Sequence, residues 1–133
     1  MKDEWTESKE AVEEHFEKVR RVLSAPDCQF NFQRRRRDED PLDPFTNMNT
    51  LLALDYDEED VICELIELRV GDYWKTVTDL NRRHTPPFWI FEKKIKGKSV
   101  YIKFKIRDEA NKQIFCMSFH FSKEPVSNKP YSG

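Results

Sequence analysis

A two-residue alternation runs through residues 99–107, SVYIKFKIR, and it constrains the fold more than any other feature of the chain. Successive side chains of a β-strand point to opposite faces of a sheet, so this alternation predicts a strand with two different faces. The apolar set is Val100, Ile102, Phe104 and Ile106, and the aromatic and basic set is Tyr101, Lys103, Lys105 and Arg107. The apolar face would pack in the core, and the aromatic and basic face would be turned outward, toward solvent or a binding partner.

The composition is that of one folded domain. The 133 residues include 10 Phe, 4 Tyr and 3 Trp, and 38% of them are hydrophobic, which is enough for a sizeable core. No stretch approaches the roughly 18 apolar residues of a membrane span, and the first ten residues are too acidic for a secretion signal. We therefore expect a soluble, cytoplasmic protein with no membrane partner.

Cysteine number and spacing argue against a disulfide framework and against zinc. Cys28, Cys63 and Cys116 are odd in number, widely spaced and without a C-x-x-C pair. We expect all three to be reduced and buried, and we expect no metal site and no cofactor. His15 should be solvated in an acidic helix, and His84 should lie in a loop.

The net charge of −2 conceals a polarised chain. Residues 1–80 carry 11 Lys and Arg against 21 Asp and Glu, whereas residues 81–133 carry 12 against 4. Such a basic half indicates a polyanion site, although the acidic half could instead neutralise it within the molecule. The four arginines at 34–37 precede a run of acids, so they either grip phosphate or, as we favour, lie solvated in a loop.

The order of predicted elements gives an α+β fold. Helical spacing predicts a helix over residues 6–23, and capping residues predict two more, from Thr46 or Asn47 to Leu54 and from Asp57 onward. Strands follow at 72–78, at 88–95 and in both halves of residues 99–121, and a strand-like run lies at 28–33. We expect one domain over residues 1–133, in which N-terminal helices pack on a mostly antiparallel sheet of about four strands. Residues 1–48 would be a helical and loop extension of a core at 49–121.

A two-residue turn at Lys96-Gly97 fixes the register of the first hairpin. The resulting pairs are Ile95 with Lys98, Phe91 with Ile102, Ile90 with Lys103, Trp89 with Phe104 and Glu92 with Tyr101. In the next strand, Phe115, Met117, Phe119 and Phe121 should face the core, which leaves Cys116, Ser118 and His120 on the basic face. His120 would then lie opposite Tyr101 or one diagonal away, at roughly 5–8 Å.

Tyr101, Lys103 and His120 on one face would suit RNA cleavage without a metal ion. Such cleavage needs a base for the 2′-hydroxyl, cations for the phosphate oxygens and an acid for the departing 5′-oxygen. Further cations that could hold RNA are Lys75, Arg82, Arg83 and Lys105. Aromatic side chains beside cations favour single-stranded RNA. Each residue also has a structural alternative, namely surface packing for tyrosine, solubility for the lysines and chance proximity for His120.

Five segments in order resemble the MqsR family of type II toxin-antitoxin toxins, which are mRNA interferases of the RelE-like fold. They are NTLLALDYDEEDVICELIEL, DYWKTVTD, PPFWIF, KGKSVYIKFKI and IFCMSFHF, within residues 49–121. The resemblance implies ribosome-independent cleavage of mRNA and inhibition by a cognate antitoxin protein. By position, it assigns the family's catalytic lysine, tyrosine and last basic residue to Lys75, Tyr101 and His120.

The chain departs from the family at Ile90, where the family has a glutamine that can hydrogen-bond RNA. A non-catalytic RNA-binding or regulatory module of the same fold is therefore an open alternative. A second alternative is a protein-interaction module that binds an antitoxin through its basic face or a sheet edge.

Overall fold

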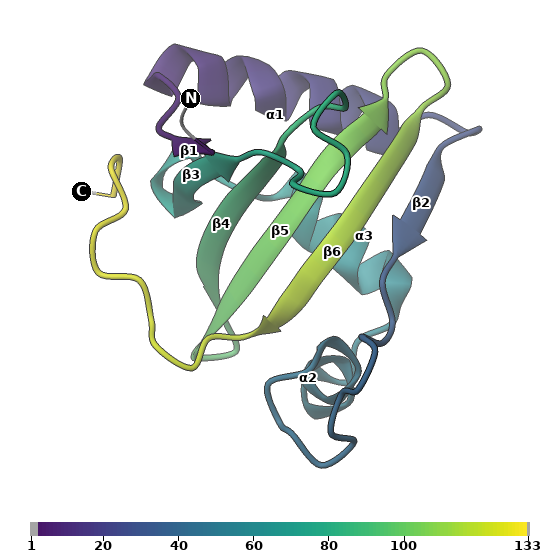
Figure 1. Cartoon of the computed structure of the whole chain (residues 1–133), viewed down its shortest axis with the longest axis vertical. Coiled ribbons are helices and arrows are strands. Elements are labelled where there is room, and N and C mark those ends of the chain that lie inside the picture. Colours follow the sequence, from purple (N-terminus) through teal and green to yellow (C-terminus); the bar gives the residue numbers. More distant parts are fainter. Residues whose placement is uncertain (1–2, 133) are drawn as a thin grey trace.

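The computed structural model describes residues 3–132, which form a six-stranded sheet in the order β1-β3-β4-β5-β6-β2 (Figure 1). The strands are β1 (Glu4–Trp5), β2 (Gln29–Phe32), β3 (Tyr73–Val77), β4 (Phe88–Ile95), β5 (Lys98–Asp108) and β6 (Gln113–Phe121). Neighbours are antiparallel except β2, which runs parallel to β6. The α+β class and the mostly antiparallel sheet are confirmed. The expected count of about four strands is wrong, because β2 and the two-residue β1 extend the sheet at its edges.

Three α-helices, α1 (Lys9–Leu23), α2 (Asn47–Leu54) and α3 (Glu58–Ile66), precede β3, and a short 3₁₀-helix, η1 (Val70–Asp72), leads into it. The side chains of Ser8, Thr46 and Asp57 cap the N-termini of α1, α2 and α3, respectively. Each side chain accepts a hydrogen bond from the backbone N–H three residues later. The predicted starts of α2 and α3 are confirmed, and α1 begins later than expected because Ser8 provides its cap. Within residues 3–132, no helix is long and apolar enough to cross a membrane.

The core lies between the sheet and the two helices behind it, α1 and α3 (Figure 1). Val12, Phe16 and Val19 of α1 are buried there, and the Phe16 ring lies 5.6 Å from the Phe91 ring. A fully buried side chain of this size contributes roughly 1.5–3 kcal/mol to folding. The sheet therefore has a helix-covered face and a second face, called here the outer face, which is turned toward the viewer in Figure 1.

The register predicted for the central hairpin is confirmed. Ile90 lies opposite Lys103, Glu92 opposite Tyr101, and Ile95 opposite Lys98. The next pair of strands places Tyr101 directly opposite His120, which is one of the two positions predicted for it. Three strands therefore bring their polar side chains to the middle of the outer face.

A β-bulge in β6 overturns part of the predicted side-chain parity. Lys103 pairs with Ser118 but Phe104 pairs with Cys116, so β6 has an extra residue at Met117. Beyond the bulge the two faces exchange. Cys116, predicted on the basic face, is buried in the core, whereas Phe115, predicted in the core, packs against Phe88 with their ring centroids 6.1 Å apart.

Asn47 bonds to backbone groups of β6 at and after the bulge, where β2 no longer pairs with the strand. Its amide nitrogen donates to the carbonyl oxygens of Met117 (2.9 Å) and Gln33 (2.7 Å), and its side-chain oxygen accepts from the N–H of Phe119 (3.0 Å). The side chain is 5% exposed. One residue at the start of α2 thus joins the bulge in β6 to the chain that leaves β2.

Two predictions for single residues are wrong. His15 is not solvated: it is 8% exposed and stacks on Trp89 with ring centroids 3.9 Å apart. Burial among these rings, with the charge of Lys18 as a smaller cause, lowers the pKa of His15 to about 3. The cysteines were predicted to be buried, but Cys63 is exposed and Cys28 is only partly buried; all three are free thiols.

Candidate active site on the outer face

The outer face carries a groove that crosses β5. One end, about 570 Å³, is lined by Lys75, Ile90, Lys103 and Met117 together with residues 78–81. The other end, about 630 Å³, is lined by His120 and by the loop at residues 36–43. Trp74 and Tyr101 line both hollows, so the two hollows adjoin, and together they are called here the outer groove.

Tyr101 and His120 lie at the centre of the outer groove as a cross-strand pair. Their rings stack with centroids 5.2 Å apart and planes inclined by 23°. The Nδ1 atom of His120 lies 3.0 Å from the carbonyl oxygen of Phe121. Because a carbonyl can only accept, Nδ1 carries a proton, and the neutral ring keeps its lone pair on Nε2. The imidazole is therefore held in the tautomer that can take up a proton at Nε2.

Partial burial sets the protonation states of this pair and of the neighbouring lysine. Burial lowers the pKa of His120, although its hydrogen bond to Phe121 opposes the change. Burial raises the pKa of the Tyr101 phenol, against the effect of the nearby Arg36 charge. The pKa of Lys103 is lowered by burial and then by the positive charge of Arg36. At neutral pH the site thus combines a neutral imidazole, a protonated phenol and a cation.

Lys75 and Lys103 flank Ile90 in register, so both lysines reach the same end of the outer groove. Lys75 lies 4.1 Å above the ring of Trp74 and forms an ion pair with Glu4 of β1 at 2.9 Å. Ile90 is only 2% exposed. It therefore forms an apolar floor in this end of the outer groove.

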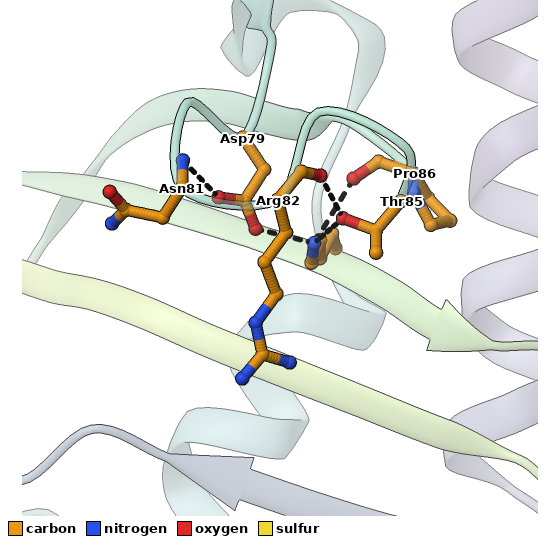
Figure 2. A network of polar contacts seen from close by, with 6 residues as sticks. Asp79, Asn81, Arg82, Thr85 and Pro86 are labelled. Carbon is orange, nitrogen blue, oxygen red and sulfur yellow. Dashed lines mark hydrogen bonds and ion pairs between the residues drawn. The ribbon is translucent and has the colours of Figure 1, made fainter.

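Lys105 is not open to a ligand. It is 1% exposed, and its ammonium donates to Asp79 (2.7 Å), to the Thr85 hydroxyl (2.9 Å) and to the Pro86 carbonyl (3.1 Å), as the dashed lines of Figure 2 show. Burial alone would raise the pKa of Asp79, but the hydrogen bond and charge of Lys105 outweigh burial and lower it. Lys105 thus holds the loop at residues 79–87 against the sheet. Because its ammonium is buried, the prediction that Lys105 binds RNA is wrong, and we leave it out of the proposed RNA-binding residues.

This loop also carries the two predicted arginines, Arg82 and Arg83, which follow the groove-lining residues 78–81 but do not line the groove themselves. Arg82 is exposed, and its guanidinium points away from the network around Lys105 (Figure 2). Arg83 is also exposed and pairs with Asp3 at 3.0 Å. The structure therefore brings Lys75, Tyr101, Lys103 and His120 together, and it places the two arginines on a loop beside them.

Sequence reasoning missed two residues of the outer groove. Trp74 lines both ends of it because a bulge in β3, between Tyr73 and Lys75, turns its side chain to the outer face. Its position next to Lys75 was the available signal. Arg36 lines the groove too, and its guanidinium donates to the Ser118 hydroxyl at 3.0 Å. Nothing in the run of four arginines distinguishes it, because the contact joins residues 82 positions apart in the sequence.

A metal ion has no cluster of ligands here: residues 3–132 contain no group of three or more His, Cys, Asp or Glu side chains that could hold one. The side chains of the outer groove include an imidazole, a phenol and two lysines, which can transfer protons and stabilise negative charge.

Comparison with known proteins gives one result. No curated protein and no solved structure matches the chain. The family described as motility quorum-sensing regulator, toxin of MqsA, matches residues 37–121. This segment is more than half of the chain and includes Lys75, Tyr101 and His120, and the chain therefore belongs to the MqsR family of toxins, which implies a cognate antitoxin.

Proposed function

We propose that the protein is the endoribonuclease toxin of a toxin-antitoxin pair and that it cleaves single-stranded mRNA in the cytoplasm without a ribosome or a metal ion. The observation that carries this proposal is the stacked Tyr101–His120 pair, with centroids 5.2 Å apart, at the centre of the outer groove. The RelE-like description of the fold, implied by the family resemblance, is part of the same proposal.

His120 would act as the general base and Tyr101 as the general acid. Nε2 of His120 removes the proton of a 2′-hydroxyl, and the 2′-oxygen attacks the adjacent phosphorus. The bond from phosphorus to the 5′-oxygen breaks, and the Tyr101 phenol supplies the proton that this oxygen needs. The products are a 2′,3′-cyclic phosphate and a free 5′-hydroxyl, and proton exchange with water resets both side chains.

Lys75 and Lys103 would stabilise the negative charge that grows on the phosphate oxygens. Arg82 and Arg83, on the exposed loop, would contact neighbouring phosphates of the same strand. Trp74 lines both ends of the outer groove and would stack on a base, which only an unpaired strand can present. This combination favours single-stranded RNA over a duplex.

The test is cleavage of a long single-stranded RNA by purified protein in the presence of a chelator. We expect Tyr101→Phe and His120→Ala each to slow cleavage by about 10²–10⁴-fold, the usual contribution of a general acid or base. His84→Ala is the matched control, because His84 is an exposed loop histidine and its loss should change nothing. Cleavage near the wild-type rate in both site variants would refute the assigned roles.

Ile90 supports a second candidate, an RNA-binding module that lacks the chemistry. At 2% exposed it presents no polar group where the family has glutamine. Such a module would bind the same RNA with an affinity that falls steeply with salt, yet leave it intact. Induced expression would separate the candidates, because only the nuclease should arrest growth and produce new transcript ends.

A further inference from the structure

Arg36 places an un-neutralised positive charge against the outer groove. Its guanidinium bonds to a neutral partner, the Ser118 hydroxyl, which is fully buried and lies opposite Lys103 in the sheet. Among the other cations around the groove, Lys75 pairs with Glu4 and Arg83 with Asp3, whereas Lys103, Arg37 and Lys123 line the groove without an ion pair within residues 3–132. Among residues 3–132, no ion pair involves Arg36.

The backbone around Arg36 is held in place. The N–H of Arg36 donates to the Glu39 carboxylate (3.3 Å), and the N–H of Glu39 donates to the Arg36 carbonyl (3.3 Å), which closes a turn. Glu39 therefore binds the backbone of Arg36 and not its guanidinium. Before the turn, Gln33 is fixed to β6, since its N–H donates to the Cys116 carbonyl (3.0 Å) and its carbonyl accepts from Asn47 (2.7 Å).

We propose that Arg36 is a phosphate-binding residue of the RNA site, supplied by a segment that precedes the part of the chain matched by the family. The match begins at residue 37, so the family does not assign this role. The inference rests on the proposed function, because it takes the outer groove to be the place where the RNA backbone lies.

The chemistry of guanidinium suits this position. A guanidinium group has five N–H donors in a planar fork that matches a phosphate, and the contact with Ser118 occupies one of those of Arg36. Lys103, by contrast, is partly buried beside two other cations, which lowers its pKa. Arg36 thus supplies a positive charge with unused N–H donors beside Lys103, whose lowered pKa makes its protonated form less favourable.

The acidic residues that follow Arg36 limit where a phosphate can lie. Asp38, Glu39, Asp40 and Asp43 line the same end of the groove as Arg36 and His120. They would repel RNA that ran along the loop itself. The Arg36 guanidinium reaches β6, where it donates to Ser118, so a strand that crosses β5 and β6 could contact it without running along the loop.

The test measures binding and does not depend on cleavage. Fluorescence anisotropy with a short 2′-O-methyl RNA, which cannot form the 2′-nucleophile, gives Kd at several salt concentrations. We expect Arg36→Ala to weaken binding about tenfold at low salt and to reduce the slope of log K against log salt by about 0.7, the loss of one phosphate contact. Arg36→Lys should keep the slope and lose part of the affinity, because it keeps the charge but not the planar fork of donors.

Arg35→Ala is the matched control, because Arg35 is the exposed neighbour in the same run and does not line the groove. Equal affinities and equal salt slopes for Arg36→Ala and Arg35→Ala would overturn the proposal. A wild-type protein that binds RNA but leaves unmodified RNA intact would refute the endonuclease function, and the comparison of Arg36 with Arg35 would still decide the present inference. Urea unfolding of each variant shows whether the fold is unchanged, as expected for exposed side chains.

Discussion

Asn47→Ala should destabilise the protein far more than the loss of an ordinary helix-terminal asparagine. The side chain makes three hydrogen bonds to backbone groups of two other segments, at Gln33, Met117 and Phe119. Alanine removes all three at once and leaves the backbone groups of the β6 bulge without partners.

The magnitude follows from how far water can reach each group. The Phe119 N–H is buried, so losing its partner should cost about 2 kcal/mol, whereas the two carbonyl oxygens are partly buried and should cost about 1 kcal/mol each. The sum is about 4 kcal/mol, a large part of the 5–15 kcal/mol that stabilises a typical domain.

Urea denaturation measures this loss, and with a typical slope of about 2 kcal/mol per molar it should lower the midpoint by about 2 M. Asn49→Ala is the control, because Asn49 lies two residues away in α2 and also donates to two backbone carbonyls, at Pro41 and Asp43, in a more exposed loop. It should cost no more than about 1 kcal/mol, since water can replace its bonds. Equal losses in the two variants would refute the view that Asn47 stabilises the bulge.

Three further predictions concern buried and titrating groups. Lys105→Leu should cost about 3–5 kcal/mol in urea unfolding, because it leaves Asp79 buried without its partner, and adding Asp79→Asn should recover part of the loss. Cleavage should rise with pH as His120 loses its proton, and the midpoint of this rise should lie below 6.5, the ordinary pKa of histidine. Arg36→Ala should move the midpoint upward, because it removes a positive charge that disfavours the imidazolium. A pH profile of kcat/KM tests both shifts. His15 has a pKa of about 3 in the folded protein and about 6.5 in the unfolded chain, so its contribution to stability is complete above pH 6.5 and declines as the pH falls toward 3. The free energy of unfolding should therefore fall by about 2 kcal/mol between pH 7 and pH 5. His15→Phe should abolish this part of the pH dependence of unfolding.

The middle of the sheet could be predicted from the sequence because its signals are local. The alternation in β5 and the turn at Lys96-Gly97 leave one register that buries Ile102 and Phe104, and every pair of that hairpin follows from it. The same logic placed His120 opposite Tyr101. The α2 and α3 starts were equally local, since a capping side chain acts on a backbone N–H three residues away.

The remaining features depend on contacts between distant segments. The bulge in β6 shifts the strand register by one residue, which the periodicity of the sequence cannot show. Asn47, which hydrogen-bonds to the bulge, lies 70 residues away from Met117. His15 has polar neighbours in sequence, yet the packing of α1 on the sheet stacks it against Trp89. β1 is a two-residue strand, which is too short to carry a period.

The polarised charge of the chain left two explanations open, a polyanion site or internal neutralisation, and the structure supports a division between them according to burial. Lys105 pairs with Asp79 almost without solvent, so an RNA phosphate could not replace that carboxylate without exposing a buried charge. Lys75 pairs with Glu4, whose side chain is 64% exposed, and a pair of this kind is worth only about 0–1 kcal/mol. An RNA phosphodiester carries one negative charge, as Glu4 does, and could displace this exposed carboxylate at little cost. Internal neutralisation therefore explains the buried Lys105, whereas Lys75 at the groove can exchange its carboxylate partner for an RNA phosphate.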